Sequence, residues 1–109
     1  YGQDCVKDAF YPFGKADMLG VGFVLALLEQ MTTPEEIETI FDMATINAAK
    51  TIGVTDEYGI EVGRRADIAV IDAPSAWEAI RTQPDRLWVI KNGRIIAESR
   101  TNRKLMRTK

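Results

Sequence analysis

Hydrophobic and polar positions divide the chain into a helical first half and an extended second half. Residues 18–31 are apolar at nearly every position, which predicts a buried helix that is packed on both sides. The run is shorter than the roughly 20 residues of a membrane span, and Gly20 and Gly22 interrupt it. We therefore expect no membrane insertion. If its neighbours are missing, the helix should drive self-association, because large apolar patches are rare on monomers.

A second helix is indicated by the sequence Thr-Pro-Glu-Glu at residues 33–36. Thr33 is a suitable N-cap, and Glu36 stands at the position that completes a capping box. Apolar residues then recur at steps of three and four as far as Ile52, and Gly53 favours a left-handed helix stop. The pattern predicts one core-facing helix with a kink or a break near Thr45.

The second half of the chain has the pattern of strands. Residues 66–72 form a β-branched run that predicts a strand buried on both faces, and a short helix is expected at 75–82. Residues 87–91 and 94–98 flank an Asn-Gly pair at 92–93, which is the strongest short-range signal for a β-hairpin. We expect this hairpin to lie beside the strand at 66–72.

Composition limits the chain to one small domain. Its 109 residues are 46% hydrophobic, with 14 basic and 16 acidic side chains, which is ordinary for a globular protein. A complete eight-stranded α/β barrel is excluded, because such barrels use about 250 residues. The single cysteine allows no internal disulfide, so a cytoplasmic location is expected. The chain also begins without methionine, which favours a truncated or processed product.

The last ten residues contain five basic side chains and no acid. Such a cluster can mark a nucleic-acid-binding arm. No aromatic residue accompanies it, and the rest of the chain is acidic. We therefore predict a solvated tail and no nucleic-acid partner.

Four segments together resemble one known group of enzymes. They lie at residues 2–6 (Gly-Gln-Asp-Cys-Val), 10–19 (Phe-Tyr-Pro-Phe-Gly, then Asp-Met-Leu), 44–53 (Ala-Thr-Ile-Asn-Ala-Ala-Lys to Gly) and 58–94 (Tyr-Gly-Ile, Gly, Ala-Asp, Val and Asn-Gly-Arg). In this order they resemble the C-terminal part of the amidohydrolase superfamily of metal-dependent hydrolases, most closely its cytosine deaminase-like branch. The first two segments favour that branch, and the later ones are common to many amidohydrolases.

The resemblance implies an α+β fragment. Residues 1–57 would be the C-terminal end of the hydrolase barrel, with the last strand end, an active-site loop and two to three helices that close an incomplete TIM-like (β/α)8 barrel. Residues 58–109 would be a hairpin or three-strand part of the small composite β-sandwich, followed by the basic tail. The exposed strand edges of such a part would favour pairing with another chain.

By the same resemblance, Asp4 is the catalytic residue and a metal ligand. It would bind one divalent metal, zinc or iron, and would carry the proton of the metal-bound water to the departing nitrogen. The chain contains no histidine, and such sites need about three protein ligands. We therefore expect the other ligands to lie upstream, no metal to bind to this chain, and the chain to be inactive alone.

Three further residues are expected near a small heterocyclic substrate. Cys5 occupies the position where cytosine deaminases often have a second acid, so a triazine, pterin or other cyclic amidine is as credible as cytosine. Cys5 can equally be a small buried hydrophobe. Tyr11 and Phe13 can form an aromatic wall for a flat ring, or they can simply cover the first helix. Gln3 stands where some relatives have histidine, and we do not assign it as a ligand.

Two hypotheses of different class follow. The first is a deaminase that acts on a C–N bond of a cyclic substrate and of which this chain is a part. The second is a free-standing, non-catalytic interaction module that dimerises through its apolar helix. A reading frame with a His-x-His motif upstream would favour the first.

Overall fold

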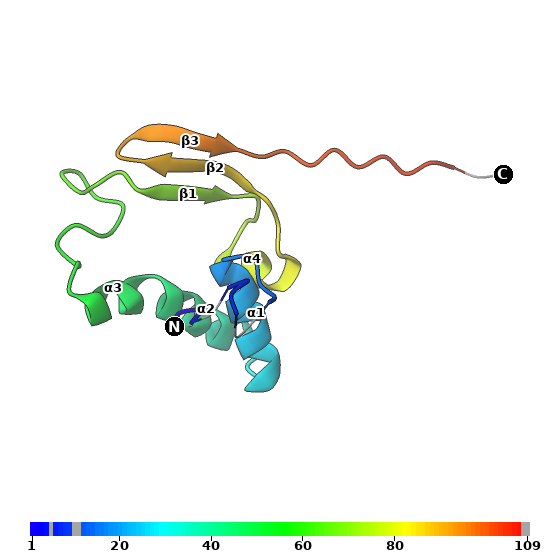
Figure 1. The fold of residues 1–109 in the computed structure, drawn as a ribbon, viewed down its shortest axis with the longest axis horizontal. Helices are drawn as coiled ribbons and strands as arrows, with labels where there is room; N and C mark the ends of the chain where they lie inside the picture. The colour runs from blue at the N-terminus through cyan, green and yellow to red at the C-terminus, as the bar shows by residue number, and fades with distance from the viewer. Residues whose placement is uncertain (5, 10–11, 108–109) are drawn as a thin grey trace.

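The computed structural model describes residues 1–4, 6–9 and 12–107. A cluster of helices lies on one side of the molecule and a small sheet on the other, and the C-terminal tail extends away from both (Figure 1). The elements are α1 (Met18–Leu28), α2 (Pro34–Ala44), α3 (Ile46–Ile52), β1 (Ile68–Ile71), α4 (Ala76–Thr82), β2 (Arg86–Lys91) and β3 (Arg94–Glu98). The α+β prediction is confirmed, whereas closure of a barrel by these helices stays a prediction.

Helix α1 is covered on one face within this chain, and packing on both of its sides stays a prediction. Leu19, Gly22 and Ala26 are buried against the other helices. Val24 and Leu28 lie on the opposite side, and Leu28 is 75% exposed. Because every side of this helix is apolar, the sequence does not indicate which face is exposed to solvent. The described part of the chain packs against only one side of it. None of the helices in the described ranges combines the length and the apolar character that a membrane crossing requires.

The capping box that begins α2 is confirmed. The Glu36 amide donates to the Thr33 hydroxyl at 3.3 Å, and the Thr33 amide donates to the Glu36 carboxylate at 3.0 Å. Hydrogen bonding of the Glu36 carboxylate, first to the Thr33 backbone amide and then to the Thr33 side chain, lowers the pKa of Glu36, because it favours the ionised form. The break near Thr45 is also confirmed: Thr45 has non-helical backbone angles between α2 and α3, and its hydroxyl donates to the Phe41 carbonyl at 2.8 Å.

The three strands form an antiparallel sheet in the order β1-β2-β3. The predicted hairpin is present, with Lys91 opposite Arg94 across the turn. Asn92 and Gly93 both have positive φ, at 49° and 75°, as a two-residue hairpin turn requires. The hairpin lies beside β1, as the sequence predicts.

Strand β1 is only partly buried, so the prediction of burial on both faces is wrong. Ala69 is exposed, and its neighbours in the strand are half-buried. Close packing occurs among α1, α2 and α4 and, separately, among the three strands. The sheet therefore lies beside the helical cluster, and the helices do not form a layer that covers it.

The hydrophobic core lies between α1, α2 and α4. Ile40 of α2 and Ile80 of α4 are the most deeply buried large side chains, at 0% and 1% exposure. Leu19, Ala26, Ile37 and Ala79 complete the cluster around them. Because α4 lies between β1 and β2 in the sequence, its packing in this core attaches the sheet to the helices.

Replacing Ile40 with alanine should lower the free energy of unfolding by about 2–5 kcal/mol, because it leaves a cavity in a fully packed site. The same change at Ile52, which is 73% exposed, should alter it by less than about 0.5 kcal/mol. Urea unfolding followed by circular dichroism measures both. Equal effects of the two substitutions would show that the core does not lie at Ile40.

Candidate functional site

Tyr1 anchors the N-terminal segment on the helical cluster. Its hydroxyl donates to the Met18 carbonyl at 2.8 Å, and its amino group donates to the Met43 carbonyl at 2.6 Å. The ring lies against Gly22, where a side chain would collide with the Tyr1 hydroxyl. Burial of the ring, and secondly the nearby charge of Asp17, raise the pKa of the Tyr1 hydroxyl. The hydroxyl thus stays protonated and remains a donor at neutral pH.

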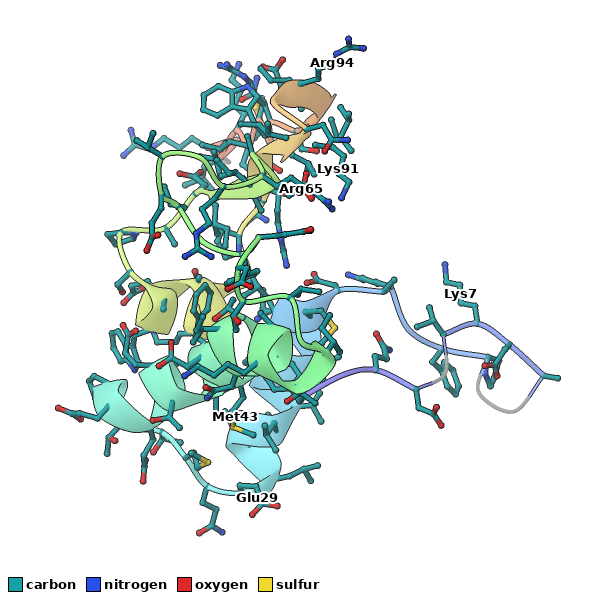
Figure 2. All side chains as sticks on the ribbon, turned by 90° about the vertical axis from the view of Figure 1, so that its left-hand side faces the viewer. Lys7, Glu29, Met43, Arg65, Lys91 and Arg94 are labelled. Atoms are coloured by element: carbon teal, nitrogen blue, oxygen red, sulfur yellow. The ribbon has the colours of Figure 1, made fainter. Side chains whose placement is uncertain are left out.

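Asp4 follows this anchor on an exposed loop. The Asp4 side chain is exposed, and farther along the loop the Lys7 amide donates to the Phe13 carbonyl at 2.9 Å. Lys7 lies on a part of the loop that projects away from the helices (Figure 2). Phe13 is 67% exposed, so the structure places its ring outside the core and beside the loop that carries Asp4.

Asp4 is a single candidate metal ligand within this chain. Across residues 1–4, 6–9 and 12–107, no three carboxylate, thiol or imidazole side chains come together in a group that could hold a metal ion. The described residues alone therefore do not fit a catalytic metal, because one carboxylate is too few donors. Cys5 and Tyr11, the other predicted site residues, lie outside the described residues. The assignment of site residues thus stays a prediction.

A cavity of about 580 Å³ lies at the base of the loop, between it and α1. Tyr1, Gln3, Gly14 and Asp17 are among its lining residues, and Asp4 is not. The Oε1 atom of Gln3 is buried without a hydrogen-bond partner. A methyl group on Gly14 would lie 2.8 Å from the Gln3 Nε2 atom, so glycine at position 14 makes room for the Gln3 amide.

The loop returns to the helices at Asp17, the N-cap of α1. One Asp17 carboxylate oxygen accepts from the Leu19 amide at 3.0 Å. The same carboxylate binds Arg86 of β2 through both of its oxygens, with 3.3 Å between Nη1 and Oδ2. The side chain of Gln83 donates to the Leu19 carbonyl at 3.0 Å. The loop, α1 and the start of β2 therefore meet at the first turn of α1.

Sequence reasoning misses Arg86 and Gln83. Asp17 before an apolar helix is a recognisable N-cap signal, but Arg86 lies 69 residues farther along the chain. No local pattern identifies a partner at that separation. Only the fold brings the two side chains together.

This chain belongs to the Amidohydrolase family, whose sequence pattern it matches over residues 1–97. It is 38% identical over 96 residues to N-isopropylammelide isopropyl amidohydrolase of Pseudomonas sp. (strain ADP), an alignment that covers 88% of this chain and 24% of the relative. A shorter stretch of 44 residues is 57% identical to an imidazolonepropionase of Fusobacterium nucleatum, covering 39% of this chain and 10% of that enzyme. The chain thus spans about a quarter or less of these relatives.

Solved structures agree with this assignment. The 5-methylcytosine deaminase from Klebsiella pneumoniae, crystallised with phosphonocytosine, superposes with a TM-score of 0.87 at 27% identity, over 95% of this chain and 25% of that one. N-isopropylammelide isopropylaminohydrolase from Burkholderia multivorans superposes with a TM-score of 0.79 at 32% identity, over 85% of this chain and 24% of that one. The predicted resemblance to amidohydrolases is confirmed.

Two glycines of α1 provide a matched test of the Tyr1 anchor. Gly22→Ala should lower the free energy of unfolding by about 1–3 kcal/mol, because the new methyl group overlaps the Tyr1 hydroxyl and approaches Ile40 Cγ2 to 3.2 Å. Gly20→Ala meets nothing closer than 3.7 Å, and should raise it by about 0.5–1 kcal/mol through helix propensity. Chemical unfolding of both variants is the measurement, and a neutral Gly22→Ala would refute the close packing of Tyr1.

Proposed function

We propose that this chain is the C-terminal part of a metal-dependent hydrolase that cleaves a C–N bond of a small heterocyclic compound. The observation that carries the proposal is the similarity of nearly the whole chain to a deaminase, with a TM-score of 0.87 over 95% of its residues. The family match over residues 1–97 supports the same conclusion. Fold alone does not fix a function, so the proposal also depends on Asp4.

We assign two parts to the chain within that enzyme. Residues 1–57 contribute the end of the last barrel strand, the loop with Asp4 and the helices that follow, and residues 58–109 contribute strands to a small β-sandwich. The stretch without helix or strand between α3, which ends at Ile52, and β1, which begins at Ile68, supports a boundary near residue 57. Helix α4 of the second part then packs against α1 and α2 of the first part. The exposed edge β3 fits a sheet that gains further strands elsewhere in the protein.

Asp4 is the residue to which we assign chemistry. Its exposed carboxylate can serve as one ligand of a zinc or iron ion whose remaining ligands come from other parts of the enzyme, and a bound ion of this kind increases the acidity of water. Asp4 also accepts a proton from the attacking water and returns it to the departing nitrogen. The oxygen of water becomes bonded to the ring carbon, the C–N bond breaks, and the nitrogen leaves as ammonia or an amine.

The substrate class follows from the relatives. They are named for 5-methylcytosine and N-isopropylammelide, so we propose a flat nitrogen heterocycle that carries an exocyclic nitrogen. Phe13, exposed on the loop that carries Asp4, is suited to contact the face of such a ring. The candidates are a cytosine-like ring and a ring like that of N-isopropylammelide.

The proposal is tested with the complete enzyme, prepared with zinc or iron and supplied with cytosine, 5-methylcytosine or N-isopropylammelide. We expect release of ammonia or isopropylamine, and Asp4→Asn should lower kcat by about 10²–10⁴-fold, since that is the usual effect of losing a general base. Asp8→Asn, the same change on the same loop, should alter kcat by no more than about twofold. Full activity of Asp4→Asn would contradict the role of Asp4.

We further propose that the 109-residue chain alone is inactive and associates with copies of itself. The apolar surface of α1 supports this, because Phe23, Val24, Leu27 and Leu28 are all exposed large side chains on one helix. Apolar groups that are clustered in this way are stabilised when they are removed from water. The unpaired edges of β1 and β3 provide a second surface for association.

Leu28→Glu should therefore weaken self-association, because it places a charge within the apolar surface of α1. Leu105→Glu is the matched control, since Leu105 is also exposed but lies on the tail, and it should leave association unchanged. Sedimentation velocity at several protein concentrations distinguishes monomers from dimers. A wild-type chain that stays monomeric at every concentration would contradict the proposal.

A further inference from the structure

The first turn of α1 is the meeting point of three segments that lie far apart in the sequence. Tyr1 donates to the Met18 carbonyl, and Asp17 accepts from the Leu19 amide. Gln83, which follows α4, donates both to the Leu19 carbonyl at 3.0 Å and to the Ile80 carbonyl at 2.7 Å. Arg86 completes the junction through its contact with Asp17.

Within this junction the pair of Arg86 and Asp17 joins two different parts of the molecule. Arg86 is the first residue of β2, whereas Asp17 is the last residue before α1. The guanidinium contacts both carboxylate oxygens, and both side chains are partly buried. A bidentate contact of this type fixes the relative orientation of the two side chains as well as the distance between them. Lysine cannot reproduce it with a single ammonium group.

Both ends of the loop that carries Asp4 are fixed at this turn. Tyr1 holds the end before Asp4, and Asp17 holds the other end. Between the anchors, the described part of the loop projects away from the helices (Figure 2), and a cavity of about 580 Å³ separates its base from α1. Asp4 therefore lies between two anchors that both contact the first turn of α1.

We propose that Arg86, acting through Asp17, is a positioning residue that keeps the loop in the position in which Asp4 can take part in the reaction. The start of β2 then influences the reaction through the position of the loop. This inference depends on the proposed function, because the position of Asp4 affects the rate only if Asp4 takes part in the reaction. Small displacements of reacting groups reduce rates strongly, so a loose anchor should reduce kcat.

The test uses the complete enzyme, four single variants and one double variant. Arg86→Gln removes the positive charge. Arg86→Lys retains a positive charge but cannot contact both oxygens of Asp17 as a guanidinium does. Asp17→Asn keeps a side-chain oxygen that can cap α1 but removes the negative charge. Arg65→Gln is the matched control, because Arg65 forms an exposed ion pair with Glu57 at 2.9 Å and lies beside the sheet, away from Lys7 (Figure 2). The combination of Arg86→Gln with Asp17→Asn closes a double-mutant cycle.

Amide hydrogen exchange is the first readout. In Arg86→Gln the amides of Leu19 and Lys7, which are bonded to Asp17 and Phe13, should exchange at least about tenfold faster, because their protection depends on the anchor. The Ile37 amide, bonded to Thr33 within α2, should keep its rate. Equal acceleration at all three amides would indicate a general loss of stability and would overturn the proposal.

Kinetics are the second readout. Arg86→Gln should lower kcat by about tenfold or more and change KM by less than about threefold, because a positioning residue does not bind the substrate. Arg86→Lys should recover part of the loss, Arg65→Gln should match the wild type, and the double variant should be no worse than the poorer single variant. Additive losses in the double variant, or an unchanged kcat in Arg86→Gln, would overturn the proposal.

The two proposals fail in different ways. The proposed function is contradicted if the folded, metal-loaded wild-type enzyme releases no ammonia or amine from the three test compounds. The proposed effect of Arg86 on the reaction is then contradicted as well. The exchange experiment still decides whether Arg86 holds the loop. An active enzyme whose Leu19 and Lys7 amides do not respond to Arg86→Gln defeats only the positioning proposal.

Discussion

The contact between Arg86 and Asp17 is the interaction on which the arrangement of this molecule depends. It joins the start of β2 to the start of α1, which are elements of the two parts that otherwise pack mainly within themselves. Asp17 also caps α1, so one carboxylate stabilises the helix and sets its orientation relative to the sheet. The core formed by α1, α2 and α4 then keeps this first turn in place.

Part of the apolar surface of this chain is left uncovered. A self-sufficient domain buries its large apolar side chains, but here those of α1 are covered on one face only, and β3 is exposed along its length. Both features agree with a chain that covers about a quarter of the amidohydrolases it resembles. The same exposed apolar surface supports the proposed self-association of the isolated chain.

Features with a local cause could be predicted from the sequence. The capping box of Thr33 and Glu36 and the turn at Asn92 and Gly93 depend on residues within a few positions of one another, and both are present. The face of α1 that is buried, with Leu19, Gly22 and Ala26, could not be predicted, because a helix that is apolar all round does not indicate which side meets its neighbours. The junction of Arg86 with Asp17 is set by the fold across 69 residues. Asp4 was identified by resemblance, and its role is still a proposal.

The measurement that tests the central claim most directly is a crystal structure of the complete protein with its metal, using anomalous diffraction to locate the ion. The account predicts an anomalous peak about 2.0–2.2 Å from a carboxylate oxygen of Asp4, which is the usual distance of a carboxylate ligand from zinc. Histidines from other parts of the protein should complete the coordination. A metal that is fully coordinated without Asp4, with the Asp4 carboxylate far from it, would contradict the account.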